Sequence, residues 1–453
     1  MISVFVDSSK VGPDFYLKAG KIISGELLKL GIFDLVIFDM ADSEYTPALI
    51  GSLDSDYFRS ITINPDIKDI CDRKKAYVIF PSYRCSKKEI DETYRLLSID
   101  NDGFIISLGN PFAISQNGKS FSDKPIVSDL LITGGGLPIE SVMQDGLDSY
   151  KRRIIVSCEI AAEPFGELIQ KDDFYKKVFN GKRNVNKGSN GKTICIGGSK
   201  AYSGAVYLTY LGETSYLLGS GYSYISVPKS LESLFLLKNP QLLIKPFDDR
   251  DGNYIFDPSF LDSILDFSSI CIGNGMGVSN EAYKGISYLL KNYKGLLIID
   301  ADGLNSLAKF GTDVLSTHRC QVILTPHLME FARLIDSSVE KVSDNLLLPE
   351  KFALKYNVIV LLKSSSSLIT DGKKNYICEA GNEGLAKAGS GDILAGIILG
   401  LGRLENISAV QKAALGSYLL GRACEIYSLS DAPFTMSYKD LIGCLRSAIN
   451  ELV

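Results

Sequence analysis

The sequence predicts an α/β protein with two domains. Its 453 residues exceed what one hydrophobic core usually organises. In both halves, short continuous apolar runs alternate with segments of helical periodicity, which is typical of parallel sheets covered by helices on both faces. A polar stretch rich in Lys and Asn, residues 170–192, lies between the halves. We therefore expect one domain over residues 1–169, a linker over 170–192 and a second domain over 193–453.

The composition favours a soluble protein that binds neither nucleic acid nor membrane. Apolar residues make up 45% of the chain and charged residues 22%. No apolar run reaches the length of about 18 residues that indicates a membrane span. Residues 1–7 lack the pattern of a signal peptide and predict a short strand, so we expect a cytoplasmic protein. The formal net charge of −5 does not indicate a nucleic-acid surface.

The cysteines and histidines argue against a zinc site. Nine cysteines, among them Cys71 and Cys85, are scattered without a C-x-x-C pair, and several lie in apolar runs. They are expected to be buried free thiols. Only two histidines are present, so a site built on imidazole and thiolate is not expected.

Ten apolar runs are expected to be strands. In the first domain they are Leu35–Phe38, Ala76–Phe80, Phe104–Leu108 and Arg153–Ser157. In the second domain they are Thr193–Ile196, Tyr224–Val227, Ile270–Ile272, Leu296–Ile299, Val322–Leu324 and Val358–Leu362. Each run of the second domain ends in a loop with Gly, Asp, His or Lys. Because ligands of open α/β sheets bind outside the carboxyl ends of the strands, we expect the chemistry at this edge.

A glycine-rich stretch near the C-terminus, Gly381–Asp392, runs directly into the apolar segment Ile393–Leu401. Glycine accepts positive φ, and a tight loop at a helix start presents several backbone N–H groups to an anion. Asp392 would stand beside this anion site as a base that accepts a proton from a hydroxyl. The combination suits phosphoryl transfer to an alcohol. The alternative is an ordinary turn in which Asp392 caps or begins the helix.

Two further glycine-rich turns and an acidic turn follow predicted strands. Gly197–Ala205 and Gly273–Gly277 lack bulk, so a ligand could approach the backbone, or each is a plain strand-to-helix turn. Asp300 and Asp302 could bind hydroxyls or, through water, a divalent cation. Capping of the next helix by Asp302 explains that turn equally well.

A histidine and a lysine end the remaining strands. His327, three residues before Glu330, could hydrogen-bond a substrate, although a lone histidine is more often structural. Lys363 and the serines that follow it suit contact with nucleotide phosphates and ribose. A solvated polar turn would have a similar sequence.

Taken in order, these motifs resemble the ADP- or ATP-dependent NAD(P)H-hydrate dehydratases, a family with a ribokinase-like, three-layer fold. The resemblance covers about residues 183–453. Six ordered motifs are far more specific than any one of them. They are Gly198–Ala205, Gly273–Gly277, Ile299–Asn305, Leu324–Glu330, Leu362–Lys363 and Gly381–Asp392.

The resemblance implies repair of a damaged cofactor. NADH or NADPH that has added water across its nicotinamide ring carries a hydroxyl, which such enzymes phosphorylate from ADP or ATP before phosphate leaves. By matched position, Asp392 would contact this hydroxyl and act as its base. The nucleotide and its phosphoryl group would be bound by Lys363, Ser364, Ser365, Ser366, Ser367, Gly389, Ser390 and Gly391. The hydrated nicotinamide would be bound by Ala205, by Gly275 or Gly277, and by His327.

The cofactors and partners expected from the resemblance are ADP or ATP, Mg²⁺ and hydrated NADH or NADPH, with no resident metal site and a homo-oligomeric assembly. The chain departs from the family pattern in two places. The family usually has Pro-Gly where this chain has Leu328-Met329, and a Gly where Ala388 stands. Both changes spare the polar groups, so they bear on substrate fit rather than on reaction type.

Many members of this family carry an N-terminal, Rossmann-like epimerase domain that interconverts the two hydrate stereoisomers. Residues 128–136, with Asp129, resemble its D-x-x-x-G-T-G segment, and residues 156–162 fall where the family has V-D-I-P-S. Glu159 would replace the catalytic Asp, and Ala162 a metal-binding Ser. The N-N-G-G-D loop for phosphate and K⁺ does not occur in this half of the sequence. We therefore expect an epimerase-like fold without epimerase activity and without the K⁺ of the family's epimerase domains.

Two other functions stay open. A vitamin or sugar kinase of the same superfold would use Asp392 in the same way but release a stable phosphate ester. A non-catalytic nucleotide-binding scaffold is favoured by the altered first half. The intact sequence Gly389-Ser390-Gly391-Asp392, together with Lys363, argues against a scaffold.

Overall fold

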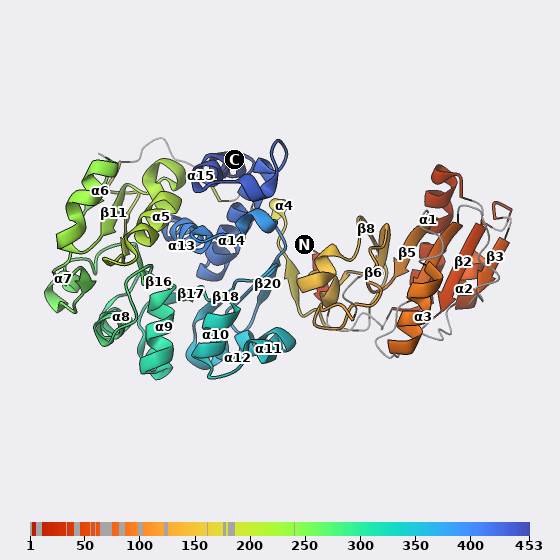
Figure 1. Ribbon diagram of the computed structural model, residues 1–453, viewed down its shortest axis with the longest axis horizontal. Coiled ribbons are helices and arrows are strands. Elements are labelled where there is room, and N and C mark those ends of the chain that lie inside the picture. Colours follow the sequence, from red (N-terminus) through yellow and green to blue (C-terminus); the bar gives the residue numbers. More distant parts are fainter. Residues whose placement is uncertain are drawn as a thin grey trace. The chain divides into compact units, whose positions relative to one another are not determined.

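The chain forms two compact units, Met1–Leu168 and Ile169–Val453, in the computed structural model (Figure 1). The structure describes all residues except 1, 6–10, 33, 40–45, 55, 59, 64–74, 81–86, 98–102, 122–125, 161, 175–177, 180–185 and 240. The stretch predicted as a linker, residues 170–192, is described in part. It contains the short helix α4 (Lys171–Phe174), and Phe174 and Val178 are buried in the core of the second unit. This part of the stretch is therefore packed rather than solvated.

A parallel sheet in the order β3-β2-β4-β5-β6-β8 forms the centre of the first unit. Its strands are β2 (Asp34–Asp39), β3 (Ser60–Ile63), β4 (Lys75–Phe80), β5 (Phe104–Leu108), β6 (Leu130–Gly134) and β8 (Arg153–Val156). Strand β1 (Ile2–Phe5) pairs in parallel with β7 (Leu137–Pro138) and antiparallel with β9 (Gly166–Leu168).

Helices cover both faces of this sheet. They are α1 (Pro13–Leu30), α2 (Thr46–Ser52) and α3 (Lys87–Leu97). Because successive side chains of a strand point to opposite faces, Leu35 packs in one cluster with α1 and α2, and Val36 packs in another with α3. Helix α1 begins at Pro13 and ends before Gly31, which has the left-handed φ of 66° typical of a C-terminal cap.

The sheet of the second unit has the order β12-β11-β10-β15-β16-β17-β18-β19-β20. The strands from β12 to β18 are parallel, and β19 is antiparallel to both of its neighbours, β18 and β20. They are β10 (Lys192–Ile196), β11 (Tyr222–Ser226), β12 (Leu243–Ile244), β15 (Ser269–Ile272), β16 (Leu296–Ile299), β17 (Gln321–Leu324), β18 (Ile359–Leu362), β19 (Ser367–Thr370) and β20 (Asn375–Cys378). A separate hairpin pairs β13 (Asp249–Arg250) with β14 (Asn253–Tyr254).

Helices pack on both faces of this sheet as well (Figure 1). They are α5 (Ser203–Glu213), α6 (Glu232–Lys238), α7 (Pro258–Asp262), α8 (Asn280–Asn292), α9 (Asp302–Phe310), α10 (Leu328–Leu334), α11 (Val339–Asp344), α12 (Leu347–Tyr356), α13 (Ser390–Leu401), α14 (Ala409–Tyr427) and α15 (Tyr438–Asn450). Ile298 of β16 packs in the same core as α13 and α14. The neighbouring Ile299 faces the other way and touches α9 at Gly303. The two helix layers and the sheet give three layers.

The predicted fold class is confirmed. All ten apolar runs form strands, with ends that differ by two residues at the start of β11 and by at most one residue elsewhere. Seven cysteines lie in the described part of the chain, and all of them are free thiols. Cys71 and Cys85 lie outside it. In the described residues, no helix combines the length and the apolar character needed to cross a membrane.

Candidate active site

Helix α13 begins directly after a glycine in a left-handed conformation. Gly389 has a φ of 99°, and a Cβ atom at this position would lie 2.5 Å from Cδ1 of Leu208. A larger residue would therefore be strained and would clash. No side chain caps the start of α13. The N–H of Ser390 donates to the carbonyl of Lys387 at 3.3 Å, and the N–H groups of the next residues can bind an anion. Asp392 lies in this first turn, a position that fits both the functional and the structural interpretation of the sequence.

A chain of hydrogen bonds links Asp392 to residues at the ends of four strands, β15, β16, β17 and β18. Nδ2 of Asn274 donates to Oδ1 of Asp392 at 2.7 Å and to Oδ2 of Asp300 at 2.8 Å. Oδ1 of Asp300 also accepts from Oγ1 of Thr325 at 2.8 Å and from Nζ of Lys363 at 3.0 Å. We call these five residues the strand-end cluster. It holds two carboxylates close together with one cation and two neutral donors.

The cluster keeps Asp392 suited to proton transfer. Burial raises the pKa of Asp392 to about 6, the hydrogen bond from Asn274 opposes this rise, and the charge of Asp300 adds to it. A base works best when its pKa lies near the operating pH, because it is then both ionised and basic. Asp392 therefore has the position and the basicity of a proton acceptor.

Lys363 stays charged in spite of its burial. Burial alone lowers the pKa of an ammonium group, but the carboxylates of Asp300 and Glu330 raise the pKa of Lys363 by more. Its Nζ lies 4.0 Å from Oε2 of Glu330. Burial raises the pKa of Glu330 to about 7, and the charge of Lys363 opposes that rise. Lys363 is thus the cation that offsets the charges of Asp300 and Glu330.

The predicted nucleotide-binding stretch begins at this cation. The backbone N–H of Lys363 donates to the carbonyl of Pro326 at 2.8 Å, which fixes the residue beside β17. Nζ of Lys363 lies 3.2 Å from where a Cβ atom would stand on Gly391. The lysine therefore reaches the N-terminus of α13. Ser365 is exposed, whereas Ser366 is buried.

His327 caps α10 and keeps one ring nitrogen free of that role. Its Nδ1 accepts from the backbone N–H groups of Met329 and Glu330, each at 3.2 Å. In the neutral ring the proton must then lie on Nε2, since Nδ1 is the acceptor. Burial and the charges of Lys363 and Arg333 lower the pKa of His327. The half-exposed imidazole is therefore a neutral donor through Nε2, so the structural and the functional interpretation both fit.

The predicted substrate glycines lie against α5 and α9. A Cβ atom on Gly275 would lie 2.9 Å from Cβ of Ala205, so these two predicted residues are in contact. A Cβ atom on Gly277 would meet nothing within 4 Å, which leaves open space on that side. The N–H of Gly277 donates to Oδ2 of Asp302 at 2.9 Å. Asp302 thus holds this loop and does not cap α9 through its side chain.

A hollow of about 540 Å³ begins next to Gly277. It is lined by Val278, Asn305, Ala308, Lys309, Arg333 and Asp336. The guanidinium of Arg333 is fixed there, because Nη1 donates to Oδ1 of Asn305 at 2.9 Å. The hollow carries two cations, Lys309 and Arg333, and one carboxylate, Asp336.

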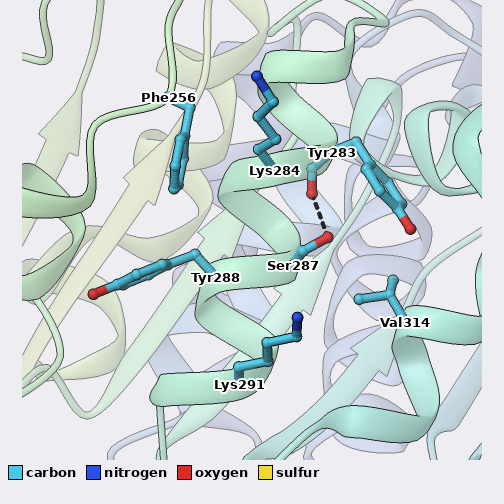
Figure 2. A pocket seen from close by; sticks show the side chains of 7 residues that line it. All are labelled: Phe256, Tyr283, Lys284, Ser287, Tyr288, Lys291 and Val314. Carbon is cyan, nitrogen blue, oxygen red and sulfur yellow. Dashed lines mark hydrogen bonds between the residues drawn. The ribbon is translucent and has the colours of Figure 1, made fainter.

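A separate hollow of about 360 Å³ lies on α8 (Figure 2). Its lining residues are Phe256, Tyr283, Lys284, Ser287, Tyr288, Lys291 and Val314. Figure 2 shows aromatic and lysine side chains around the helix, with a hydrogen bond of 2.7 Å from Ser287 to the carbonyl of Tyr283. This lining contains no carboxylate and shares no residue with the strand-end cluster. We therefore place the candidate active site at the cluster.

The predicted epimerase residues of the first unit are arranged differently from a catalytic site. Asp129 accepts from the backbone N–H of Ile105 at 2.8 Å and forms an ion pair of 2.7 Å with Lys151. Both of its carboxylate oxygens are thus engaged in structural contacts. Glu159 is exposed, and Ala162 is half-buried.

Sequence reasoning missed the roles of Asn274 and Thr325. Asn274 lies inside a glycine-rich turn, and Thr325 precedes the Pro-His pair, so neither stands out as a chemical group. Both follow strands whose carboxyl ends meet at one edge of the sheet. That shared edge is the signal that could have found them.

Comparison with known proteins identifies the second unit. Residues 193–446 match the family model described as NAD(P)H-hydrate dehydratase. A bifunctional NAD(P)H-hydrate repair enzyme of Dictyoglomus turgidum is 26% identical over 81% of this chain and 73% of its own length. Its counterpart in Moorella thermoacetica is 30% identical over 59% of this chain, and the match spans half of that protein. An ATP-dependent (S)-NAD(P)H-hydrate dehydratase of Dictyostelium discoideum is 30% identical over 48% of this chain and 70% of its own.

Solved structures confirm the ribokinase-like fold. An ADP/ATP-dependent NAD(P)H-hydrate dehydratase from Bacillus subtilis, co-crystallised with ATP and Mg²⁺, superposes with a TM-score of 0.54 at 21% identity. The match covers 64% of this chain and 99% of that one. A ribokinase-like superfamily protein from Enterococcus faecalis gives a TM-score of 0.54 at 20% identity, over 65% of this chain and 99% of its own.

Proposed function

Because the chain belongs to the NAD(P)H-hydrate dehydratase family, we propose that it dehydrates hydrated NADH and NADPH with ATP or ADP as the phosphoryl donor. The observation that carries the proposal is the place of Asp392. Its carboxylate lies in the uncapped first turn of α13, where an anion can bind, and it is held there by the strand-end cluster. A proton acceptor and a phosphoryl site thus lie side by side.

The reaction proceeds in two steps. In the first step, Asp392 accepts the proton of the ring hydroxyl, and the hydroxyl oxygen attacks the terminal phosphoryl group of the nucleotide. The nucleotide, shorter by one phosphate, leaves. The phosphate ester then breaks at the ring carbon. Phosphate leaves with the bonding electrons, a ring proton is lost from the neighbouring carbon, and the double bond of the reduced nicotinamide is restored. The products are NADH or NADPH, phosphate and the shorter nucleotide.

Backbone and lysine groups stabilise the moving phosphoryl group. The first turn of α13 has no capping side chain, and Nζ of Lys363 lies next to Gly391. Such fixed donors are effective when they face the oxygens on which charge develops. We assign Gly389, Ser390 and Gly391 to the phosphoryl group and the stretch Lys363–Ser367 to the nucleotide, with Lys363 at its phosphoryl end.

The hydrated nicotinamide lies on the other side of Asp392 in this proposal. Ala205 and Gly275 pack against each other and form one wall, and Gly277 faces open space. Nε2 of His327 can donate to an acceptor oxygen of the ring substituent, because the capping bonds fix its tautomer. The remainder of the dinucleotide extends into the hollow that carries Lys309 and Arg333, whose charges suit a diphosphate.

The residues do not form a cage for Mg²⁺. Mg²⁺ prefers free carboxylates and phosphate oxygens. Asp300 already accepts from Asn274, Thr325 and Lys363, and among the described residues no group of three or more His, Cys, Asp or Glu side chains could hold a metal ion. We therefore expect Mg²⁺ to bind through the nucleotide phosphates.

We further propose that the first unit has lost epimerase activity. Asp129 is committed to Ile105 and Lys151, and Glu159 would displace a carboxylate by about an ångström relative to Asp, a change that can cost about 10²-fold in rate. Ala162 offers no side-chain oxygen to a cation. The whole protein would then repair one stereoisomer of the hydrate.

The proposal is tested by incubating enzymically hydrated NADH with the protein and ATP or ADP. We expect the absorbance of reduced nicotinamide to return together with one phosphate for each NADH. Asp392→Asn is the matched control, because it keeps the shape and removes the base. A stable phosphate ester without return of the absorbance would identify a kinase instead, and consumption of neither substrate would refute both.

A further inference from the structure

Asn274 is the one neutral side chain that touches both carboxylates of the strand-end cluster. Its side chain is almost completely buried, with 1% of the residue exposed. Nδ2 lies 2.7 Å from Oδ1 of Asp392 and 2.8 Å from Oδ2 of Asp300. The two N–H bonds of one amide are thus used on two different carboxylates, which lie on separate elements of the fold.

The orientation of this amide is fixed from three sides. The nitrogen must face the two carboxylates, because an amide oxygen there would meet only acceptors. The opposite atom, Oδ1, accepts a bond from Sγ of Cys271 at 3.3 Å. The backbone carbonyl of Asn274 accepts from the N–H of Gly198 at 2.8 Å. The amide therefore cannot turn away without breaking several contacts.

We propose that Asn274 is a positioning residue for Asp392, which keeps Oδ1 of that carboxylate occupied and directs Oδ2 at the hydroxyl of the substrate. The inference rests on the proposed function only in taking Asp392 as the base. A carboxylate in a first helical turn can rotate about two side-chain bonds. A donor bound to one oxygen removes that freedom and leaves a single oxygen to accept the proton.

The same bond keeps Asp392 ionised among unfavourable neighbours. The charged groups that face it are Asp300 at the end of β16, Asp302 at the start of α9 and Lys363 at the end of β18. Two of these three are negative, and burial also favours the protonated acid. Asn274 and Lys363 act in the opposite direction. Loss of the amide should therefore protonate Asp392 at a higher pH.

A titration that needs no activity tests this directly. The protein is labelled with ¹³C in the aspartate carboxyl groups, and Asp392 is identified by the signal missing from Asp392→Asn. Asn274→Leu removes the donors at similar volume, and Asn274→Ala guards against a clash from the branched side chain. A hydrogen bond to a charged group of ordinary strength corresponds to a displacement of about one to two pH units. We expect the midpoint of Asp392 to move upward by that amount in both variants.

Thr193→Val is the matched control for a general loss of stability. Thr193 donates to Glu213, which is also a buried carboxylate, but it belongs to β10 and does not touch the cluster. The control variant should have a lower melting temperature than the wild type, but the same midpoint for the titration of Asp392. If the midpoint of Asp392 in the two Asn274 variants stays within about 0.3 pH units of the wild type, the inference is wrong.

Rate measurements separate this inference from the proposed function. In an active enzyme, the acidic limb of the pH–rate profile of Asn274→Leu should shift to higher pH by the same amount as the titration. The acidic limb of the control, Thr193→Val, should lie at the same pH as that of the wild type. If the wild type restores no NADH and the titration still moves, the proposed function fails and the positioning role stands. If the rates fall but neither titration nor limb moves, Asn274 has only a structural role.

Discussion

Lys363→Met tests the electrostatic account of the site without any assumption about substrates. Removal of one partner of a buried ion pair typically costs about 3–5 kcal/mol. We expect the lower end, about 3 kcal/mol, because the side chain of Lys363 is 21% exposed and Asp300 keeps Thr325 and Asn274 as donors. For a unit of this size, that loss lowers the melting temperature by roughly 6–12 °C.

The loss should also depend on pH. Without the cation, the pKa of Glu330 rises further above its value in the unfolded chain, so the folded variant binds more protons than the unfolded one. Its stability must then fall as pH rises. Because the chain contains no tryptophan, thermal unfolding is followed by circular dichroism, at pH 6 and at pH 8. The loss of stability relative to the wild type should be larger at pH 8.

Lys192→Met is the control for this experiment. Lys192 pairs with Asp266 at 2.8 Å, but the two side chains are 41% and 65% exposed, so solvent screens the pair and it contributes little to stability. If Lys363→Met melts no lower than Lys192→Met, or if its deficit is larger at pH 6, then Lys363 does not neutralise buried carboxylates as described.

The remaining predictions concern the base, the loop and the first unit. Because the pKa of Asp392 is raised to about 6 and the base must be ionised, turnover of the wild type should fall as pH falls through about 6, and a limb near pH 4 would contradict this. Asp392→Asn should fold normally and lose about 10²-fold or more in the rate of NADH recovery. Gly389→Ala should destabilise the fold by about 1–3 kcal/mol, since its φ is 99° and Leu208 lies close, whereas Gly25→Ala, with nothing within 4 Å, should not lower the melting temperature. Chiral separation of the two hydrates should show no acceleration of their interconversion by the protein, and Glu159→Gln should change nothing; a clear acceleration that this variant abolishes would show an active epimerase.

The fold was predictable because its strands are continuous apolar runs. A strand that is buried on both faces has no polar alternation, so runs such as Ile270–Ile272 and Leu296–Ile299 are visible without a structure. Asp392 was predictable for a related reason. A left-handed glycine such as Gly389 and a first-turn carboxylate leave a recognisable local pattern, which involves only neighbouring residues.

The partners of Asp392 were not predictable from local pattern. Asn274 and Asp392 are 118 residues apart, and only the shared edge of the sheet brings them together. The position of Lys363 was expected, but not its bond to Asp300, because the sequence does not show which cation neutralises which acid. The packing of Phe174 and Val178 was missed, because single apolar residues in a polar, lysine-rich stretch form no periodic pattern that would indicate burial.

The measurement that tests the central claim most directly follows the oxygen of the ring hydroxyl. Hydrated NADH is prepared in water enriched in ¹⁸O, so that the hydroxyl carries the label, and is then returned to ordinary water with the protein and ATP. If the hydroxyl that Asp392 deprotonates attacks the phosphoryl group, the C–O bond breaks in the second step and each released phosphate carries one ¹⁸O. Mass spectrometry of the phosphate should find that label in proportion to the NADH recovered. Label that appears in water, with unlabelled phosphate, would show that the hydroxyl leaves without being phosphorylated and would contradict the account.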